Sequence, residues 1–439
     1  MVSVIISGIG LVSILGQSNI DHFECLDSCY TRLAMQTDGS YSQIVNHIEI
    51  NDIKSYIKNK KSLKFFGLDT VLGCICSKLA LSDAEIFDEI INSDSEEFGI
   101  IIGSCYESKP LELGEIITNY IDEENKINYK ELGELGIREI PPLWMVTRLP
   151  NTVAGQISIE NNIKGINLSL VNGMNSGIVS IGEAFLAIKQ KRVKRVICGG
   201  VDDKINPEFL HQMKEKGLLA SSAIEAVPFG ITSKGNLFTE GGSVLILEKK
   251  VDDNRNGYAQ ICGYCNRYIP NIDYKDEQEI SMLMKECMKE ALMDACIIEE
   301  SVDFIQSSAG GNQLLDRAEA IAIRDMFKNH VFVTSCQSYI GNTRVAQGAF
   351  SVAVSCLSFK EKCIFPILTE GELYLENEIN YIKGKKHEYD AKVCIVNSFS
   401  YLGEICTLVL RKSWSYEKSS NYRNGSYFPL RNWSYKILE

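Results

Sequence analysis

The stretch that decides the fold reads Gly165-Ile-Asn-Leu-Ser-Leu-Val-Asn-Gly-Met174-Asn-Ser-Gly177 and continues as Ile181-Gly-Glu-Ala-Phe185. Residues 168–172 are typical of a short β-strand. Residues 176–190 follow with a helical period that places four apolar side chains on one side: Ile178, Ile181, Phe185 and Ile188. A strand that leads through a tight turn into a helix is a unit of α/β proteins. The sequence therefore predicts an α/β fold around this segment.

The same alternation extends outward along the chain. Apolar runs predict strands at 2–7, 98–103, 195–199 and 244–248 in the first half. The second half repeats the pattern, with strands predicted at 302–307, 331–335, 393–397 and 406–411 and helices at 316–327 and 345–359. Continuous apolar strands are typical of a sheet covered on both faces. We therefore expect a duplicated body with halves at 1–250 and 251–412, followed by an aromatic-rich tail at 413–439.

Composition excludes several classes of protein. The chain has 439 residues, with 45 Lys and Arg against 57 Asp and Glu, and a net charge of −12. Nucleic-acid binding normally requires a basic face, so we expect no nucleic-acid partner. No stretch of 18 or more residues is predominantly apolar without polar or glycine breaks, so we expect no membrane span.

The N-terminal residues and the cysteines point to a cytoplasmic protein. The first twenty residues are uncharged, but no basic residue precedes Arg32, so a strand at 2–7 that ends in a turn at Gly8-Ile-Gly10 explains them better than a signal peptide. The fifteen cysteines are odd in number and scattered, with a single CxxC at 262–265. They are interpreted as reduced, mostly buried thiols. We expect neither a metal site nor a cofactor.

Several motifs, in their order and spacing, resemble the β-ketoacyl-acyl-carrier-protein synthase family. Besides the segment quoted first, these are Ser7-Gly-Ile-Gly10, Leu149-Pro-Asn-Thr-Val-Ala-Gly-Gln156, Pro228-Phe229 with Gly235 and Glu240-Gly241, and Asn397-Ser-Phe399. The resemblance extends from residue 2 to about residue 411. It implies the thiolase-like fold, a duplicated α-β-α-β-α arrangement in five layers.

The resemblance also locates the residues that perform the family's chemistry, and here the sequence departs. Members of the family use a cysteine to accept the acyl group, two histidines for decarboxylation and enolate stabilisation, and a lysine beside the second histidine. Four residues stand at these positions: Met174 at the cysteine, Ala309 at the first histidine, Gln337 at the lysine and Asn342 at the second histidine. A thioether cannot form a thioester, and an amide cannot shuttle a proton near neutral pH. None of the five histidines lies in either motif.

The family's gating loop is altered as well. Its Gly-Phe-Gly-Gly is replaced by Ser400-Tyr401-Leu402-Gly403, which follows Phe399. Two glycines are thereby replaced by residues with a Cβ, which restricts the backbone. We therefore predict a gate that no longer opens.

The resemblance implies a non-catalytic subunit, inactive alone, that pairs with an active ketosynthase and helps to set chain length in a type II polyketide synthase, as chain length factors do. An acyl carrier protein would dock mainly on the partner, because this chain is acidic. Leu111, Leu113, Ile116 and Ile117 are the candidates for tunnel lining. The alternatives are an accessory subunit of an aryl polyene system, a homodimeric pseudoenzyme, and an acyltransferase with a displaced nucleophile at Cys105 or Cys336.

Overall fold

The computed structural model describes residues 2–33, 47–48, 50–104, 112–140, 143–146, 149–250 and 257–413. Within these ranges, eleven strands form one mixed sheet in the order β10-β8-β7-β12-β13-β6-β1-β5-β4-β2-β3. Those of the first half are β1 (Val4–Ser13), β2 (Phe98–Gly103), β3 (Asn167–Leu170), β4 (Arg195–Val201) and β5 (Gly241–Lys249). Those of the second half are β6 (Ala259–Tyr268), β7 (Phe304–Gln306), β8 (Phe332–Thr334), β10 (Asn380–Tyr381), β12 (Val393–Phe399) and β13 (Glu404–Lys412). β9 (Cys363–Ile364) pairs separately with β11 (His387–Glu388).

The sheet repeats one topology twice. From its edge inward, the first half runs β3-β2-β4-β5-β1. The second half runs β8-β7-β12-β13-β6, with the short strand β10 added at its edge beside β8. In each half the first three strands are parallel and the next two pair antiparallel, and β1 meets β6 at the centre. The duplication expected from the sequence is therefore confirmed.

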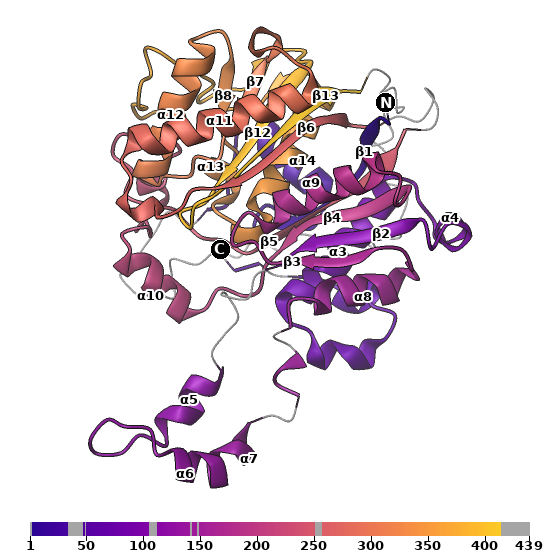
Figure 1. Ribbon diagram of the computed structural model, residues 1–439, viewed down its shortest axis with the longest axis vertical. Coiled ribbons are helices and arrows are strands. Elements are labelled where there is room, and N and C mark those ends of the chain that lie inside the picture. Colours follow the sequence, from indigo (N-terminus) through magenta and orange to yellow (C-terminus); the bar gives the residue numbers. More distant parts are fainter. Residues whose placement is uncertain are drawn as a thin grey trace, which may run out of the picture.

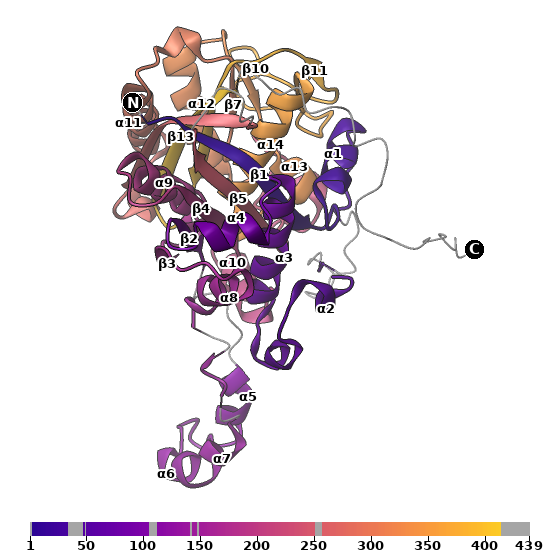
Figure 2. The same cartoon turned by 90° about the vertical axis from the view of Figure 1, so that its right-hand side faces the viewer.

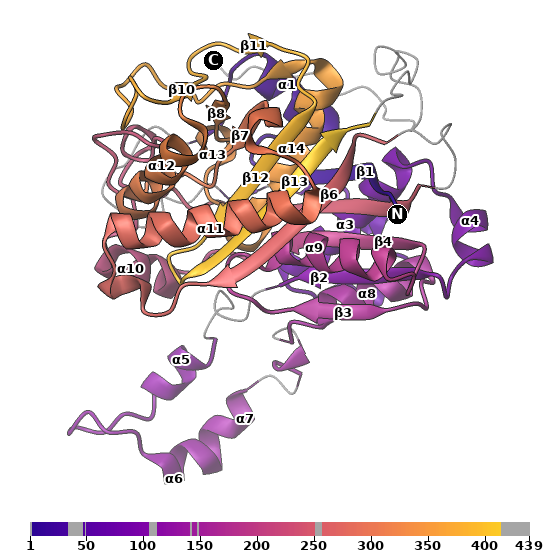
Figure 3. The ribbon, with the colours of Figure 1, turned by 45° about the horizontal axis from the view of Figure 1, so that its top comes forward.

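Helices cover both faces and fill the space between the two halves (Figures 1 and 3). The long helices are α3 (Leu68–Asp83), α8 (Thr152–Asn161), α9 (Ser176–Lys189), α11 (Glu277–Ala295), α12 (Gln313–Phe327) and α14 (Gln347–Glu361). Side chains of α9 and α14 share one apolar core with strands of both halves, whereas α3 and α8 pack outside the first half and α11 and α12 outside the second. This order gives the five layers of the thiolase-like fold, as predicted.

The predicted face of α9 is buried. Ile178, Ile181 and Ile188 are each 0% exposed, and Phe185 is 3% exposed. The helix therefore lies between the two halves with its N-terminus at the turn that follows β3.

The prediction for the first strand was wrong in its end point. β1 continues through Gly8 and Gly10 to Ser13 instead of turning there. A Cβ on Gly8 would lie 2.2 Å from the Ala80 carbonyl oxygen, and one on Gly10 would lie 2.0 Å from that of Cys76. The two glycines thus allow α3 to lie directly against the strand, and no turn is needed to explain them.

The remaining helices are shorter. They are α1 (Asn19–Asp27), α2 (Ile53–Tyr56), α4 (Asp88–Ser93), α5 (Glu112–Thr118), α6 (Tyr129–Glu131), α7 (Ile137–Glu139), α10 (Pro207–Glu215) and α13 (Gln337–Ile340). Of these, α5, α6 and α7 project from the body (Figures 1 and 2). Within the described ranges, no helix has the length and apolar character needed to cross a membrane.

Candidate functional site

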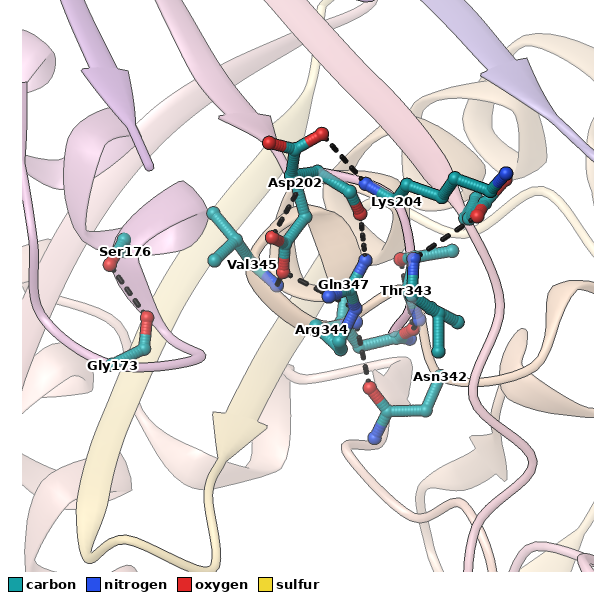
Figure 4. A network of polar contacts seen from close by, with 12 residues as sticks. Gly173, Ser176, Asp202, Lys204, Asn342, Thr343, Arg344, Val345 and Gln347 are labelled. Atoms are coloured by element: carbon teal, nitrogen blue, oxygen red, sulfur yellow. Dashed lines mark hydrogen bonds and ion pairs between the residues drawn. The ribbon is translucent and has the colours of Figure 1, made fainter. Parts of the chain in front are cut away.

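The strand-to-helix turn that ends in Met174 keeps a defined geometry. Gly173 adopts φ +54°, and the Ser176 hydroxyl donates to the Gly173 carbonyl at 2.7 Å while it accepts from the Asn172 N–H at 2.7 Å (Figure 4). Residue 174 is thereby held at the N-terminus of α9, where the family's nucleophile would stand. The Met174 side chain packs against a small apolar cluster around Phe209 and Phe238. It therefore contributes packing at this position and no nucleophile.

The loop after β7 carries Ala309, at the position where the resemblance predicts the family's first histidine. Ala309 is 1% exposed, and its carbonyl accepts a hydrogen bond from the Ser335 hydroxyl at 2.6 Å. The neighbouring Ser308 carbonyl accepts from Gln337 Nε2 at 2.5 Å. Gln337 thus links the two loops that hold the degenerate motifs.

The side-chain amide of Asn342 is held by one backbone group and one side chain. Its Oδ1 accepts from the Arg344 N–H at 2.8 Å (Figure 4), and its Nδ2 points to Asn236 Oδ1 at 3.4 Å. An amide with these contacts fixes the turn after α13. It cannot take up or release a proton as a histidine does.

These positions meet at one cavity of about 30 Å³. Met174, Gln337 and Asn342 line it, as do Ser308 and Gly310 on either side of Ala309. The rest of the polar lining combines four amides with charged and hydroxyl groups: Asn175, Asn236, Asn312 and Gln347 with Asp316, Glu319, Arg344, Ser398, Ser400 and Tyr401. A space of this size holds about two water molecules.

Two buried carboxyl groups stabilise the loop after β7, and sequence reasoning missed both. Burial raises the pKa of Glu319 to about 7 and that of Asp316 to about 6. Glu319 accepts hydrogen bonds from Ser307, Ser308 and Asn397, and Asp316 accepts from the N–H groups of Phe229, Gly310 and Gly311. Both groups line the cavity, but their oxygens are occupied by loop contacts. Their spacing at i and i+3 on α12 was the only signal in the sequence.

A buried ion pair behind the cavity was also missed. Arg344 Nε lies 3.3 Å from Asp202 Oδ2, and both side chains are 1% exposed (Figure 4). The guanidinium also donates to the Asp203 carbonyl and stacks over Phe209, 5.4 Å from its ring centroid. Arg344 adopts φ +54°, which is unusual for a residue with a Cβ. The pair joins the end of β4 to the short turn Arg344–Ala346 of the second half.

The gating loop is tied to its surroundings at several points. The Ser308 hydroxyl accepts from the Phe399 N–H at 2.7 Å. Asn175 Nδ2 donates to the carbonyls of Ser398 at 2.7 Å and Glu404 at 3.0 Å. Beyond Phe399, Lys216 Nζ lies 5.4 Å from the centroid of the Tyr401 ring. These contacts are what a closed gate requires, and its fixed position remains a prediction.

Of the two thiols considered as a displaced nucleophile, the structure describes Cys336. Cys336 is 2% exposed, and burial raises its pKa to about 11, so it is protonated at neutral pH. Cys105 lies outside the described residues. Cys262 and Cys265 lie three residues apart on β6 and point to opposite faces of the sheet. In the described part of the chain, no three His, Cys, Asp or Glu side chains are placed to hold a metal ion.

The structure describes the side chains of two of the four tunnel candidates. Leu111 falls outside the described residues, as does the tail after residue 413, and Leu113 lies on α5. Ile116 and Ile117 are half-buried on the same helix, in the segment that projects from the body. Neither Ile116 nor Ile117 lines the cavity. Their role as tunnel lining stays a prediction.

Comparisons with known proteins show the family of this chain. The model of the β-ketoacyl synthase N-terminal domain matches residues 17–253, and that of the C-terminal domain matches residues 271–369. The 3-oxoacyl-[acyl-carrier-protein] synthase 2 of Coxiella burnetii is 25% identical over 427 residues, which cover 93% of this chain and 98% of the relative. That of Staphylococcus aureus strain MRSA252 is 23% identical, with 94% and 98% covered.

Solved structures show the same fold. The ishigamide ketosynthase/chain length factor matches with a TM-score of 0.80 and 18% identity, over 94% of this chain and 99% of that one. A β-ketoacyl synthase from Burkholderia phymatum matches with a TM-score of 0.79 and 21% identity, over 94% and 100%. A type II polyketide acyl carrier protein in complex with its hexaketide-bound ketosynthase matches with a TM-score of 0.77 and 18% identity, over 94% and 99%.

Proposed function

This chain belongs to the β-ketoacyl synthase family. Because Met174, Ala309, Gln337 and Asn342 stand where the resemblance predicts the family's catalytic residues, we propose that it is a non-catalytic subunit that pairs with an active ketosynthase. In that pair it acts as a chain length factor of a type II polyketide synthase. One observation carries the proposal. Met174, Gln337 and Asn342 line one cavity beside the loop of Ala309, and none of these four side chains can form a thioester or shuttle a proton near neutral pH.

The condensation needs a nucleophile and a hydrogen-bond donor for the enolate, and the residues at these positions supply neither. Acyl transfer needs a thiolate to form a thioester, and Met174 has no ionisable group. Loss of carbon dioxide from a malonyl group leaves an enolate, whose charge must be stabilised by a donor near the reacting carbonyl. Ala309 offers no donor, and the Asn342 amide is held by Arg344 and Asn236.

The edge of the sheet supports pairing with a chain of the same fold. β3 is the last strand of the first half, and it pairs only with β2 among the described strands. Leu168 within it is 41% exposed, and Val171 just after it is 51% exposed. An unprotected edge with exposed apolar side chains favours strand pairing with another chain. A ketosynthase partner would cover this edge and extend the sheet.

Three other functions remain to be distinguished from a chain length factor. An accessory subunit of an aryl polyene system would share this degenerate site, so the product of the pair distinguishes it from a chain length factor. An acyltransferase that uses Cys336 is disfavoured, because that thiol is buried and protonated. A homodimeric pseudoenzyme would leave this chain in a stable complex with itself.

The proposal is tested by purifying the chain alone and after co-expression with an intact ketosynthase. We expect a heterodimer by size exclusion and by mass spectrometry of the intact complex. We also expect no acyl adduct on the isolated chain after incubation with acyl and malonyl carrier protein. A well-folded chain that stays monomeric or homodimeric beside that ketosynthase would contradict the proposal.

A further inference from the structure

Three aromatic rings contact one another at the surface of the second half. They belong to Phe332 of β8, His387 of β11 and Tyr389 just after it, and their centroids lie 4.6, 5.1 and 6.0 Å apart. Tyr389 is 37% exposed, and the other two side chains are half-buried. We call these three residues the aromatic surface. β11 lies at the end of the molecule away from α5, α6 and α7 (Figures 2 and 3).

The most exposed of the three rings is held in a fixed position. The Tyr389 hydroxyl donates to Asp303 Oδ1 at 3.0 Å, and the Tyr389 N–H donates to the Lys362 carbonyl at 2.9 Å. Ile298, which is 66% exposed, precedes the short turn Glu299–Ser301 that leads into Asp303 and adds apolar area nearby. Apolar side chains that gather on a surface mark an interaction site, and a preformed site loses little entropy on binding.

The described part of the chain ends beside this surface. The Lys412 N–H donates to the Lys392 carbonyl at 2.8 Å, and Lys412 Nζ pairs with Asp390, the residue after Tyr389. Ser413 follows and is the last residue that the structure describes. The segment that comes after Ser413 therefore starts next to the aromatic surface.

The composition of residues 414–439 suits that surface. Seven of these 26 residues are Trp, Tyr or Phe, whereas aromatic residues make up 9% of the whole chain. Aromatic side chains bury a large area and favour contact with other rings. The segment has four basic and two acidic side chains, a charge of +2, so the rest of the chain carries −14 of the total of −12. Opposite net charge favours its association with the body.

We propose that residues 414–439 dock on the aromatic surface of their own chain through their aromatic side chains. A tethered segment has an effective concentration on the order of millimolar at a site within reach, which a second copy in dilute solution does not match. The proposed ketosynthase partner would cover β3, at the opposite edge of the sheet from β8 and β10, and would leave this surface free. The inference therefore goes beyond the proposed function and does not depend on it.

Tryptophan fluorescence of the full chain tests the docking, because the chain has three tryptophans. Trp144→Phe leaves Trp414 and Trp433, both in the docking segment, as the only indoles. We expect their emission to be shifted to the blue relative to the urea-unfolded chain and their quenching by acrylamide to be weaker. Emission and quenching equal to those of the unfolded chain would overturn the inference.

Variants of the aromatic surface then locate the contact. In the Trp144→Phe background, Tyr389→Ser and His387→Ser should each move emission and quenching toward the values of the unfolded chain. Thermal melting shows whether each variant is folded, and two variants keep the test informative if one is not. Tyr268→Ser is the matched control, since Tyr268 is 63% exposed at the opposite end of β13 from Lys412, and it should change nothing. Shielded indoles that neither folded surface variant affects would place the segment elsewhere and overturn the inference.

Lysine cross-linking distinguishes the chain's own segment from that of a second copy. The segment contains Lys418 and Lys436, and exposed Lys362 and Lys392 lie on either side of Tyr389. An equal mixture of unlabelled and isotope-labelled chain is cross-linked and digested for mass spectrometry. We expect links from the segment to Lys362 or Lys392 within one chain. Links between labelled and unlabelled chains would assign the surface to a second copy, and links only to other lysines would place the segment elsewhere; either result overturns the inference.

Discussion

Gln337 Nε2 donates a hydrogen bond to the Ser308 carbonyl at 2.5 Å, and this bond connects the loop after β7 to the start of α13. The resemblance predicts that Gln337 stands where the family has a lysine. In this chain the side chain holds the two segments together.

The hydrogen bond from Gln337 to the Ser308 carbonyl should contribute to the free energy of unfolding. Gln337→Ala leaves the buried Ser308 carbonyl without this donor, so we expect the free energy of unfolding to fall by about 1–2 kcal/mol. Gln212→Ala, a change on the exposed side of α10, is the control and should alter it by less than about 0.5 kcal/mol. Urea unfolding measures both. Equal stability of the two variants would show that the bond has no structural role.

Loss of the ion pair between Asp202 and Arg344 should lower the free energy of unfolding more than loss of the Gln337 side chain does. Arg344→Leu leaves the Asp202 carboxylate buried without its cation, and we expect a loss of about 3–5 kcal/mol. Asp202→Asn combined with Arg344→Leu removes both charges, so the double variant should be more stable than Arg344→Leu alone. A double variant that is the less stable of the two would contradict the assignment of this loss to an uncompensated charge.

The raised pKa of Glu319 predicts that the free energy of unfolding depends on pH. Its pKa is raised from 4.5 to about 7 in the folded chain, so the fold favours the protonated form. The resulting stabilisation is complete below pH 4.5 and is lost as the pH rises through about 7, a change of about 3 kcal/mol. Asp316, whose pKa burial also raises, likewise stabilises the fold more at low pH. Burial lowers the pKa of His22 to about 4, so His22 stabilises the fold more at high pH.

The contribution of Glu319 is isolated by Glu319→Gln, whose side chain does not titrate. The difference in unfolding free energy between wild type and variant should move in favour of the variant as the pH rises from 5 to 8. Urea unfolding at both pH values measures this. A difference that stays constant across that range would contradict the raised pKa.

Much of the fold was predictable because apolar periodicity reports burial on both faces of a sheet. The four apolar side chains of α9 and the runs at 98–103, 195–199 and 393–397 all lie in the core. β6 and α11 were missed, because the alternating burial of 259–268 and the polar face of 277–295 resemble surface segments. The glycines of β1 were misinterpreted, because their cause is the neighbouring helix α3, which is distant in sequence.

The residues of the candidate site were likewise predictable only in part. The resemblance pointed to Met174, Ala309, Gln337 and Asn342, since flanking glycines fix their alignment. It gave no sign of the Asp202–Arg344 pair or of the tie between Asn175 and Ser398, because residues 142 and 223 positions apart meet only through the fold. Long-range polar contacts of this kind leave no periodic signal in one sequence.

The cluster Lys189, Lys191, Arg192, Lys194 and Arg195 tests where the carrier protein docks. Three of its members already face acidic side chains: Lys189 with Asp294, Lys194 with Asp94 and Glu97, and Arg195 with Asp94 and Glu248. We therefore expect Lys191→Glu with Arg192→Glu to change the affinity of the heterodimer for carrier protein by less than tenfold. A larger drop, more than about 1.4 kcal/mol, would place the docking site on this chain.

The central claim is that the chemistry of the pair belongs to the partner, and product formation by two matched heterodimers tests it most directly. In the first, the nucleophilic cysteine of the ketosynthase is replaced by alanine; in the second, this chain carries Met174→Leu, which preserves apolar volume. Both are supplied with malonyl carrier protein, and ketoacyl product is measured by mass spectrometry. We predict no product from the first and nearly wild-type product from the second, whereas product from the first would show that this chain catalyses condensation itself.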